Sequence, residues 1–197
     1  MTFTRNAMNK QLFEIQSYQN QSFQNHDLEP GEYDSCTFTN CIFLNADLSG
    51  ITFYECSFVD CDLSMATLKG TAFRDVKFKN CKLLGLRFDD CNTFSLSFDF
   101  EGCILHFASF FRLKIPRTVF KNCKLEDVEF AEADLSNAVF SHCDLSRAIF
   151  DRTLLEGADF RTAVHFSIDP EQNFIQKAKF SAHNIAGLLE RYKIVVE

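Results

Sequence analysis

A strict five-residue period constrains this 197-residue chain more than any other feature of its sequence. A large apolar residue recurs at every fifth position from Phe23 to Phe88, and after Thr93 the spacing resumes at Phe98. The series then continues, displaced by two residues, from Leu105 to Phe160. Neither an α-helix, with 3.6 residues per turn, nor a strand, with two, keeps a five-residue spacing on one side for so long. The period therefore predicts a polygonal coil in which one apolar centre per unit points inward.

A second, longer period indicates how many units close one coil. It appears in six of the nine cysteines, which are 20 residues apart except for one step of 22: Cys41, Cys61, Cys81, Cys103, Cys123 and Cys143. Twenty residues at five per unit predict four units per coil and about seven coils in the rod. The two extra residues are predicted to form a bulge at 99–102, where Gly102 supplies the backbone freedom.

The sizes of the residues within each unit predict the core. Two residues before a centre stands a small residue, as in Ala46-Asp47-Leu48 and Ala133-Asp134-Leu135, and the other positions are mostly polar. Burying a ring and a small partner in each unit contributes about 25 cal/mol per Å² of apolar area, which accounts for the 24 Phe of the chain. We predict an N-terminal capping segment at 1–20, a solenoid at 21–166 and a C-terminal cap at 167–197.

The repeating unit is a small residue, then Asp or Asn, then Leu or Phe, then two polar residues, as in Cys61-Asp62-Leu63 and Cys143-Asp144-Leu145. This pattern resembles the pentapeptide-repeat family, and the resemblance covers residues from about 21 to 166. It implies an all-β fold, the right-handed quadrilateral β-helix of that family. The period itself shows the size of the coil.

The spacing of the cysteines and histidines predicts neither a metal site nor an active site. The cysteines form no Cys-x-x-Cys pair, and the five histidines lack a serine or cysteine partner in a nucleophile pattern. A core filled by stacked rings also leaves no pocket. We therefore expect buried free thiols and a protein that is not an enzyme, with no cofactor and no small-molecule substrate. Without an apolar run of about 18 residues or a signal-peptide core, we expect a cytoplasmic protein that does not contact membrane.

The formal net charge of −7 is segregated along the rod. Residues 11–68 hold nine acids and no Lys or Arg, and residues 69–124 hold eleven basic residues against five acids. Residues 126–160 return to nine acids against two arginines. One interpretation is that these charges only keep a rod soluble. The other is local mimicry of DNA, which carries about one charge per 1.7 Å, over the acidic segments.

The C-terminal residues predict a short helix and a contact between two copies. Asn184 is expected to cap a helix in which apolar residues follow the i, i+3, i+4, i+7 rule, ahead of a strand-like Ile194-Val195-Val196. The apolar tail is longer than one coil end requires, and a two-fold contact is the commonest symmetric association. One interpretation is a cap that only covers the final coil; the one we favour adds a homodimer. Its predicted residues are Ile185, Leu188, Leu189, Tyr192, Ile194 and Val195.

Three short segments resemble particular members of the family. Residues 186–191, followed by 194–196, resemble the C-terminal helix and strand of the Qnr-type quinolone-resistance proteins, and residues 61–66 are similar to another stretch of them. Residues 168–175 resemble a microcin-immunity relative. The resemblance implies a dimeric acidic rod that binds DNA gyrase or topoisomerase IV as a partial DNA mimic. It also implies resistance to quinolones or gyrase toxins, although the long projecting loops of Qnr-type proteins are missing here.

The resemblance and the charge pattern indicate a candidate surface for binding a topoisomerase, and they leave open an alternative function. The candidate residues for binding a topoisomerase are the acids of the C-terminal half: Asp127, Glu129, Glu132, Asp134, Asp144, Asp151, Glu156 and Asp159. The chain is not expected to bind nucleic acid directly. The alternative is a structural or adaptor solenoid whose basic middle, residues 69–124, and bulge hold an unrelated protein partner.

Overall fold

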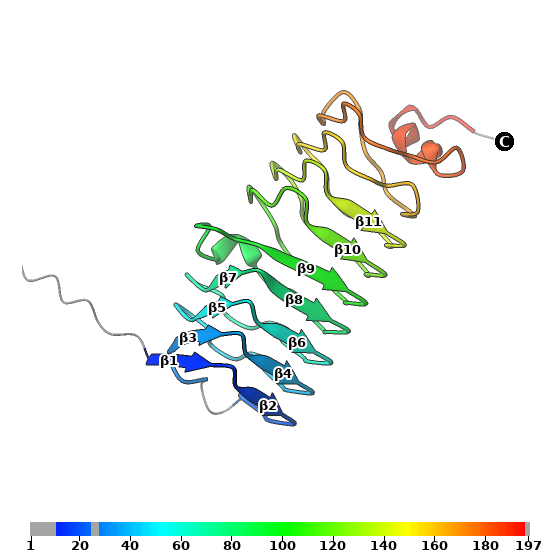
Figure 1. Cartoon of the computed structure of the whole chain (residues 1–197). Coiled ribbons are helices and arrows are strands. Elements are labelled where there is room, and N and C mark those ends of the chain that lie inside the picture. Colours follow the sequence, from blue (N-terminus) through cyan, green and yellow to red (C-terminus); the bar gives the residue numbers. More distant parts are fainter. Residues whose placement is uncertain (1–10, 25–27, 196–197) are drawn as a thin grey trace, which may run out of the picture.

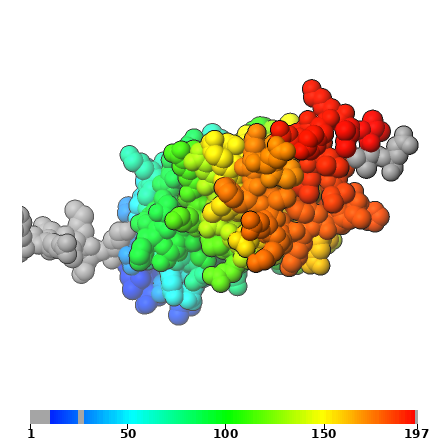
Figure 2. Space-filling view, turned by 90° about the horizontal axis from the view of Figure 1, so that it is seen from above, coloured from blue at the N-terminus to red at the C-terminus, as the bar shows by residue number. Residues whose placement is uncertain are grey.

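The chain winds into a rod of stacked four-sided coils (Figure 1). The computed structural model describes residues 11–24 and 28–195. Successive coils lie directly above one another, with the C-terminal segment at the end of the rod opposite the first coil (Figures 1 and 2). Partners in neighbouring coils are 20 residues apart, as in the pair Phe38 and Phe58, so the predicted four-unit coil is confirmed.

Two parallel sheets form two sides of the rod. The four-stranded sheet contains β1 (Gln11–Glu14), β3 (Gly31–Asp34), β5 (Thr52–Tyr54) and β7 (Ala72–Arg74). The seven-stranded sheet contains β2 (Ser17–Gln19), β4 (Thr37–Thr39), β6 (Ser57–Val59), β8 (Val76–Lys79), β9 (Phe98–Glu101), β10 (Val119–Lys121) and β11 (Val139–Ser141). Isolated parallel bridges such as Asp62 with Lys82 and Ser109 with Glu129 join the coils along the other two sides. The predicted all-β solenoid is therefore present.

Stacked side chains fill the interior. The rings of Phe38 and Phe58 lie 4.8 Å apart, and those of Phe120 and Phe140 lie 5.1 Å apart, both nearly parallel. The small inward position also bonds to the coil below, because the Cys61 thiol donates to the Phe38 carbonyl oxygen at 3.4 Å. Since a buried carbonyl without a partner is costly, this position favours Cys or Thr where a donor is useful.

The predicted bulge at 99–102 is wrong. Strand β9 already pairs with β8 in the shifted register, Phe98 opposite Val76 and Phe100 opposite Phe78, so the two extra residues precede Phe98. They lie in the turn between Asn92, which still bonds to the Thr71 carbonyl, and β9. Both Phe98 and Phe100 fit a five-residue pattern, but Phe100 is the ring that stacks on Phe78, at 5.3 Å.

Both ends of the solenoid lie beyond the predicted limits of 21 and 166. Strands β1 and β2 fall within the predicted cap at 1–20, yet they pair in full register with β3 and β4, so they belong to the first coil. The rest of that segment, residues 1–10, is outside the described residues. At the other end the Phe180 ring stacks on Phe160 at 5.4 Å, which continues the ladder past 166.

The predicted C-terminal helix is replaced by two short 3-10 turns, η2 (Ile185–Leu188) and η3 (Glu190–Tyr192); a third, η1 (Phe88–Asp90), lies mid-rod. Asn184 does not cap a helix; its side-chain amide donates to carbonyl oxygens of the last coil, at 2.8 and 2.9 Å. A glycine in so short a segment disfavours an α-helix. Ile194 and Val195 do not form a strand, and Val196 is outside the described residues. Within the described ranges, no helix is long and apolar enough to cross a membrane.

Candidate protein-interaction surface

The eight predicted acids lie on all four sides of the rod. Four of them belong to four different ladders: Glu129 with Ser109 and Ile149, Asp134 with Lys114 and Leu154, Asp159 with Val139 and Lys179, and Asp144 with Lys124 and Val164. Consecutive units of a coil form consecutive sides of the rod, and these acids belong to different units. The C-terminal acids therefore do not form a continuous anionic strip along one side.

Arginines from neighbouring coils neutralise several of these acids. The Arg147 guanidinium donates to both carboxylate oxygens of Asp127, at 2.8 and 2.7 Å, and to Glu126 at 2.6 Å. Glu132 lies between Arg112 and Arg152, at 2.6 and 2.8 Å. These hydrogen bonds hold the pKa values of the Asp127 and Glu132 carboxyls below their usual range. The pairs connect coils to one another, and they reduce the free negative charge of this part of the rod.

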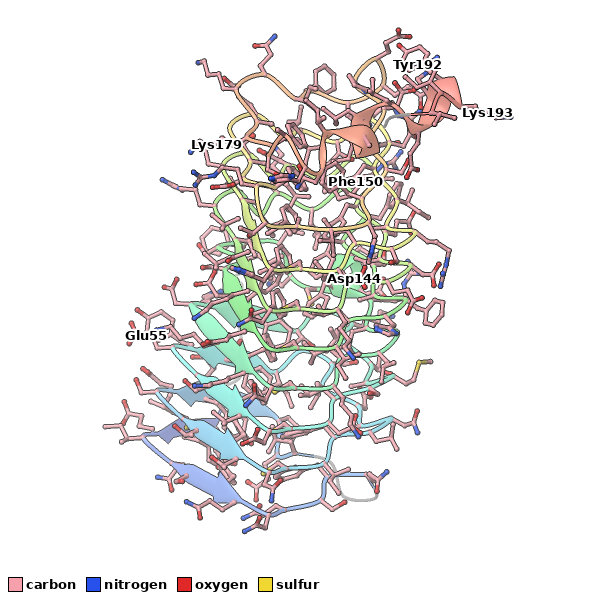
Figure 3. The ribbon with its side chains drawn as sticks, turned by 90° about the vertical axis from the view of Figure 1, so that its right-hand side faces the viewer. Glu55, Asp144, Phe150, Lys179, Tyr192 and Lys193 are labelled. Carbon is pink, nitrogen blue, oxygen red and sulfur yellow. The ribbon has the colours of Figure 1, made fainter. Side chains whose placement is uncertain are left out.

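The remaining predicted acids also have partners. Asp134 and Asp144 each accept hydrogen bonds from the backbone and hydroxyl of a serine two residues later, and Asp144 lies 2.9 Å from His165 (Asp144 is labelled in Figure 3). The other contacts are Asp151 with Arg152, Glu156 with Lys177, Asp159 with Arg161 and Glu129 with the Ser109 hydroxyl. All eight predicted acids therefore form hydrogen bonds or ion pairs within the rod.

The acids of the N-terminal half differ from those of the C-terminal half in their ion pairing. Among the described residues before position 69, no carboxylate forms an ion pair with Lys, Arg or His. Glu14, Glu32 and Asp34 lie on the four-stranded sheet, and Glu55 and Asp75 at its edge. The absence of Lys and Arg from residues 11–68 is visible in the sequence, but which acids share a side is visible only in the fold.

The six predicted dimer residues separate into two groups. Leu188 packs against the core of the last coil, and Leu189 is half-buried, so both belong to the cap. Ile185, Tyr192, Ile194 and Val195 are exposed, Val195 by 84 % (Tyr192 is labelled at the end of the rod in Figure 3). The exposed group leaves apolar surface at the C-terminal end of the rod.

Charge and close packing fix the C-terminal segment on the last coil. The Arg191 guanidinium donates to both carboxylate oxygens of Asp169, at 2.8 and 2.7 Å, and to Glu171 at 2.8 Å. Gly187 lies against the Phe166 backbone and ring so closely that a Cβ has no room. An open cavity of 410 Å³ lies between this segment and the coil, and its lining includes the apolar Val164, Leu189 and Ile194 and the polar His165, His183 and Glu190.

The nine cysteines are free and buried. Burial raises the pKa of the Cys56 thiol to about 12, because the thiolate would lose its hydration. Within the part of the chain that the structure describes, no group of three or more His, Cys, Asp or Glu side chains has the arrangement of a metal site. The thiols pack and donate to carbonyl oxygens of the coil below.

Comparison with families of known sequence matches residues 32–99 and 96–160 to the model described as the pentapeptide repeat region. These matches cover most of the rod and include the eight C-terminal acids and the N-terminal acids from Glu32 onward. No curated protein sequence matches the chain.

The fold is similar to that of several solved structures. For a trypsin-treated form of QnrB1, a plasmid-mediated fluoroquinolone resistance protein, the TM-score is 0.61 at 18 % identity, over 93 % of this chain and 99 % of that one. Full-length QnrB1 gives 0.48 at 21 % identity, over 93 % and 100 %. HetL, a pentapeptide repeat protein of a Nostoc cyanobacterium involved in regulating heterocyst differentiation, gives 0.39 at 18 % identity, over 87 % and 89 %. At these identities the comparison concerns the fold.

Proposed function

The chain belongs to the pentapeptide-repeat family, and from that premise we propose that it is a non-enzymatic protein that binds a type II topoisomerase. The partner is DNA gyrase or topoisomerase IV, which the rod engages as a partial DNA mimic. Binding of this kind confers protection against quinolones or gyrase toxins.

The observation that carries a binding function is the filled core. Every ring from Phe38 to Phe160 in the ladder of the seven-stranded sheet is buried and stacked on its neighbour, so chemical groups are available on the outside alone. That outside carries a net charge of −7, which suits a protein surface that normally binds DNA. The likeness of residues 186–196 to Qnr-type proteins, together with the QnrB1-like fold, supports a topoisomerase as the partner.

The test is a gyrase supercoiling assay with the reconstituted holoenzyme, with and without a fluoroquinolone. We expect inhibition of supercoiling at micromolar protein, or recovery of supercoiling in the presence of the drug, and a direct complex in a binding measurement. Topoisomerase IV decatenation is measured in parallel. If inhibition, drug protection and binding are all absent with both enzymes, a topoisomerase is not the partner, and the adaptor alternative is favoured.

We also propose that the rod is a homodimer through its C-terminal end. The exposed apolar residues Ile194 and Val195 lie beside the 410 Å³ cavity, and a second copy would cover both. The double change Ile194→Asp and Val195→Asp is expected to give a monomer in sedimentation with an unchanged circular dichroism spectrum. Leu188 is unsuitable for this test because it packs on the core. Ile42→Asp, on a side of the rod, is the matched control, and a dimer that survives the double change contradicts the proposal.

A further inference from the structure

The outer face of the four-stranded sheet exposes apolar side chains that the described residues cover only in part. Leu12 and Ile15 lie at β1 and Tyr54 on β5, with Ile15 exposed by 82 %. The strands are in register, so successive outward positions stand above one another along the rod axis. We call this surface, together with the turn beyond β7, the β1–β7 face.

Carboxylates lie on the same face as these apolar side chains. Glu14 stands beside Asp34 in neighbouring strands, and Glu55 beside Asp75 at the corner, while Glu32 lies further along β3. A hydrogen bond with Glu55 raises the pKa of the Tyr54 phenol, and the charges of Asp75 and Asp34 act in the same direction. Arg74 of β7 stands beside Tyr54 in the same row, but the five carboxylates outnumber it, so this face has a negative net charge.

The two-residue insertion forms one edge of the β1–β7 face. Its turn bonds to the backbone of β7, where Ser97 donates to the Phe73 carbonyl at 3.0 Å, and it exposes Phe94 by 71 %. The Asn92 side chain accepts from the Phe94 backbone at 2.9 Å, and the Arg74 guanidinium lies 5.7 Å from the centre of the ring. Arg74 Nε is buried and has no hydrogen-bond partner among the described residues. The exposed ring is thus held in place at the end of the acidic sheet.

We propose that the β1–β7 face is a docking surface for a basic amphipathic helix of another protein, lying along the rod axis. This rests on the proposed function in its general form, a rod that binds a protein. Successive coils are about 4.8 Å apart and successive turns of an α-helix about 5.4 Å, so one Lys or Arg per turn meets the carboxylates of successive coils. An extended strand places same-side residues about 6.8 Å apart, which matches the coils less well. Leu12, Tyr54 and Phe94 contact the apolar residues of the helix.

The probe is a fluorescein-labelled peptide of lysine and leucine in helical periodicity, with a scrambled peptide of the same composition as reference. The full chain is expected to bind the periodic peptide more tightly, and more weakly as salt rises. The triple change Glu32→Gln, Asp34→Asn and Glu55→Gln is expected to weaken binding about tenfold. Phe94→Ser removes an exposed ring and is expected to weaken it about threefold without unfolding the rod.

The matched control is Asp47→Asn, Asp60→Asn and Asp62→Asn, which changes the charge equally in the same half of the rod but on other sides. It is expected to change binding less than about twofold. If both triple variants lose peptide affinity equally, net charge alone explains the effect and the proposal is overturned. Equal affinity for the periodic and the scrambled peptide would also overturn it. If the protein self-associates and the first triple change abolishes this self-association, the face binds a second copy of the chain, and the proposal is overturned.

Gyrase measurements with the same variants separate this inference from the proposed function. If the wild-type protein binds the peptide as described and leaves both topoisomerases unaffected, the proposed function fails and the docking surface stands. If gyrase binding survives the first triple change and the periodic peptide does not bind, the docking surface fails and the proposed function stands.

Discussion

The two halves of the rod have the same core, but their surface acids differ in whether they are paired with cations. The ring pairs Phe38–Phe58 and Phe120–Phe140 stack at 4.8 and 5.1 Å, so the interior is continuous from one half to the other. Outside, Asp127 and Glu132 are held by arginines, whereas Glu14 and Glu55 have acidic neighbours. In a solenoid, core and surface can therefore vary independently, because the inward and the outward positions of each unit are different residues.

The difference follows from charge at a separation of 20 residues, the distance between neighbours in adjacent coils. In the C-terminal half this separation joins opposite charges, as in Asp127 with Arg147 and Glu132 with Arg152. In the N-terminal half it brings like charges together, as in Glu14 with Asp34. Opposite charges stabilise the stack slightly, and like charges leave a surface suited to a basic partner.

The largest expected effect tests whether the cores are equivalent. Phe58→Ala and Phe140→Ala each remove a fully buried ring and are expected to lower the free energy of unfolding by about 3–5 kcal/mol, nearly equally. Urea denaturation followed by circular dichroism measures both. If the loss of unfolding free energy in one half is several times that in the other, the two cores differ.

A smaller effect concerns acid. The pKa values of Asp127 and Glu132 are lowered in the folded protein by their arginines, so their stabilising contribution is present above the ordinary carboxyl pKa and is lost as pH falls through the folded value. Below about pH 4, the protection factors of the amide hydrogens in the coils around 126–152, which correct for the slower intrinsic exchange in acid, are expected to fall. Arg147→Gln should remove part of this acid-induced change, and an unchanged profile in that variant would contradict the assignment.

The smallest effect is the response to salt, which should have opposite signs in the two halves. Between about 0.01 and 1 M NaCl the Debye length falls from about 30 to 3 Å, which screens repulsion and attraction alike. Hydrogen exchange is expected to slow in coils 31–75 and to accelerate in coils 113–166. The same sign in both halves would show that the charge pairs do not determine local stability.

The regular parts of the fold could be predicted because a period is a local property that needs no long-range information. The errors lie where two local patterns compete. Phe98 and Phe100 both fit the five-residue spacing, and only stacking on Phe78 at 5.3 Å decides between them. Asn184 is a good helix cap by residue type, but carbonyl oxygens of the last coil bind its side chain instead. The sequence shows where the candidate acids lie along the chain, but it does not reveal their partners.

The coil can be worked out from the amino-acid sequence alone: five residues per unit, four units per turn, a Phe and Cys interior, and an acidic exterior. These follow from repetition, because identical units with the same inward residues must stack in the same way. The tertiary structure decided which of the acids are free. Charges distant in the chain become neighbours only when the coils close, so Asp127 meets Arg147 and Glu14 meets Asp34 through the fold alone.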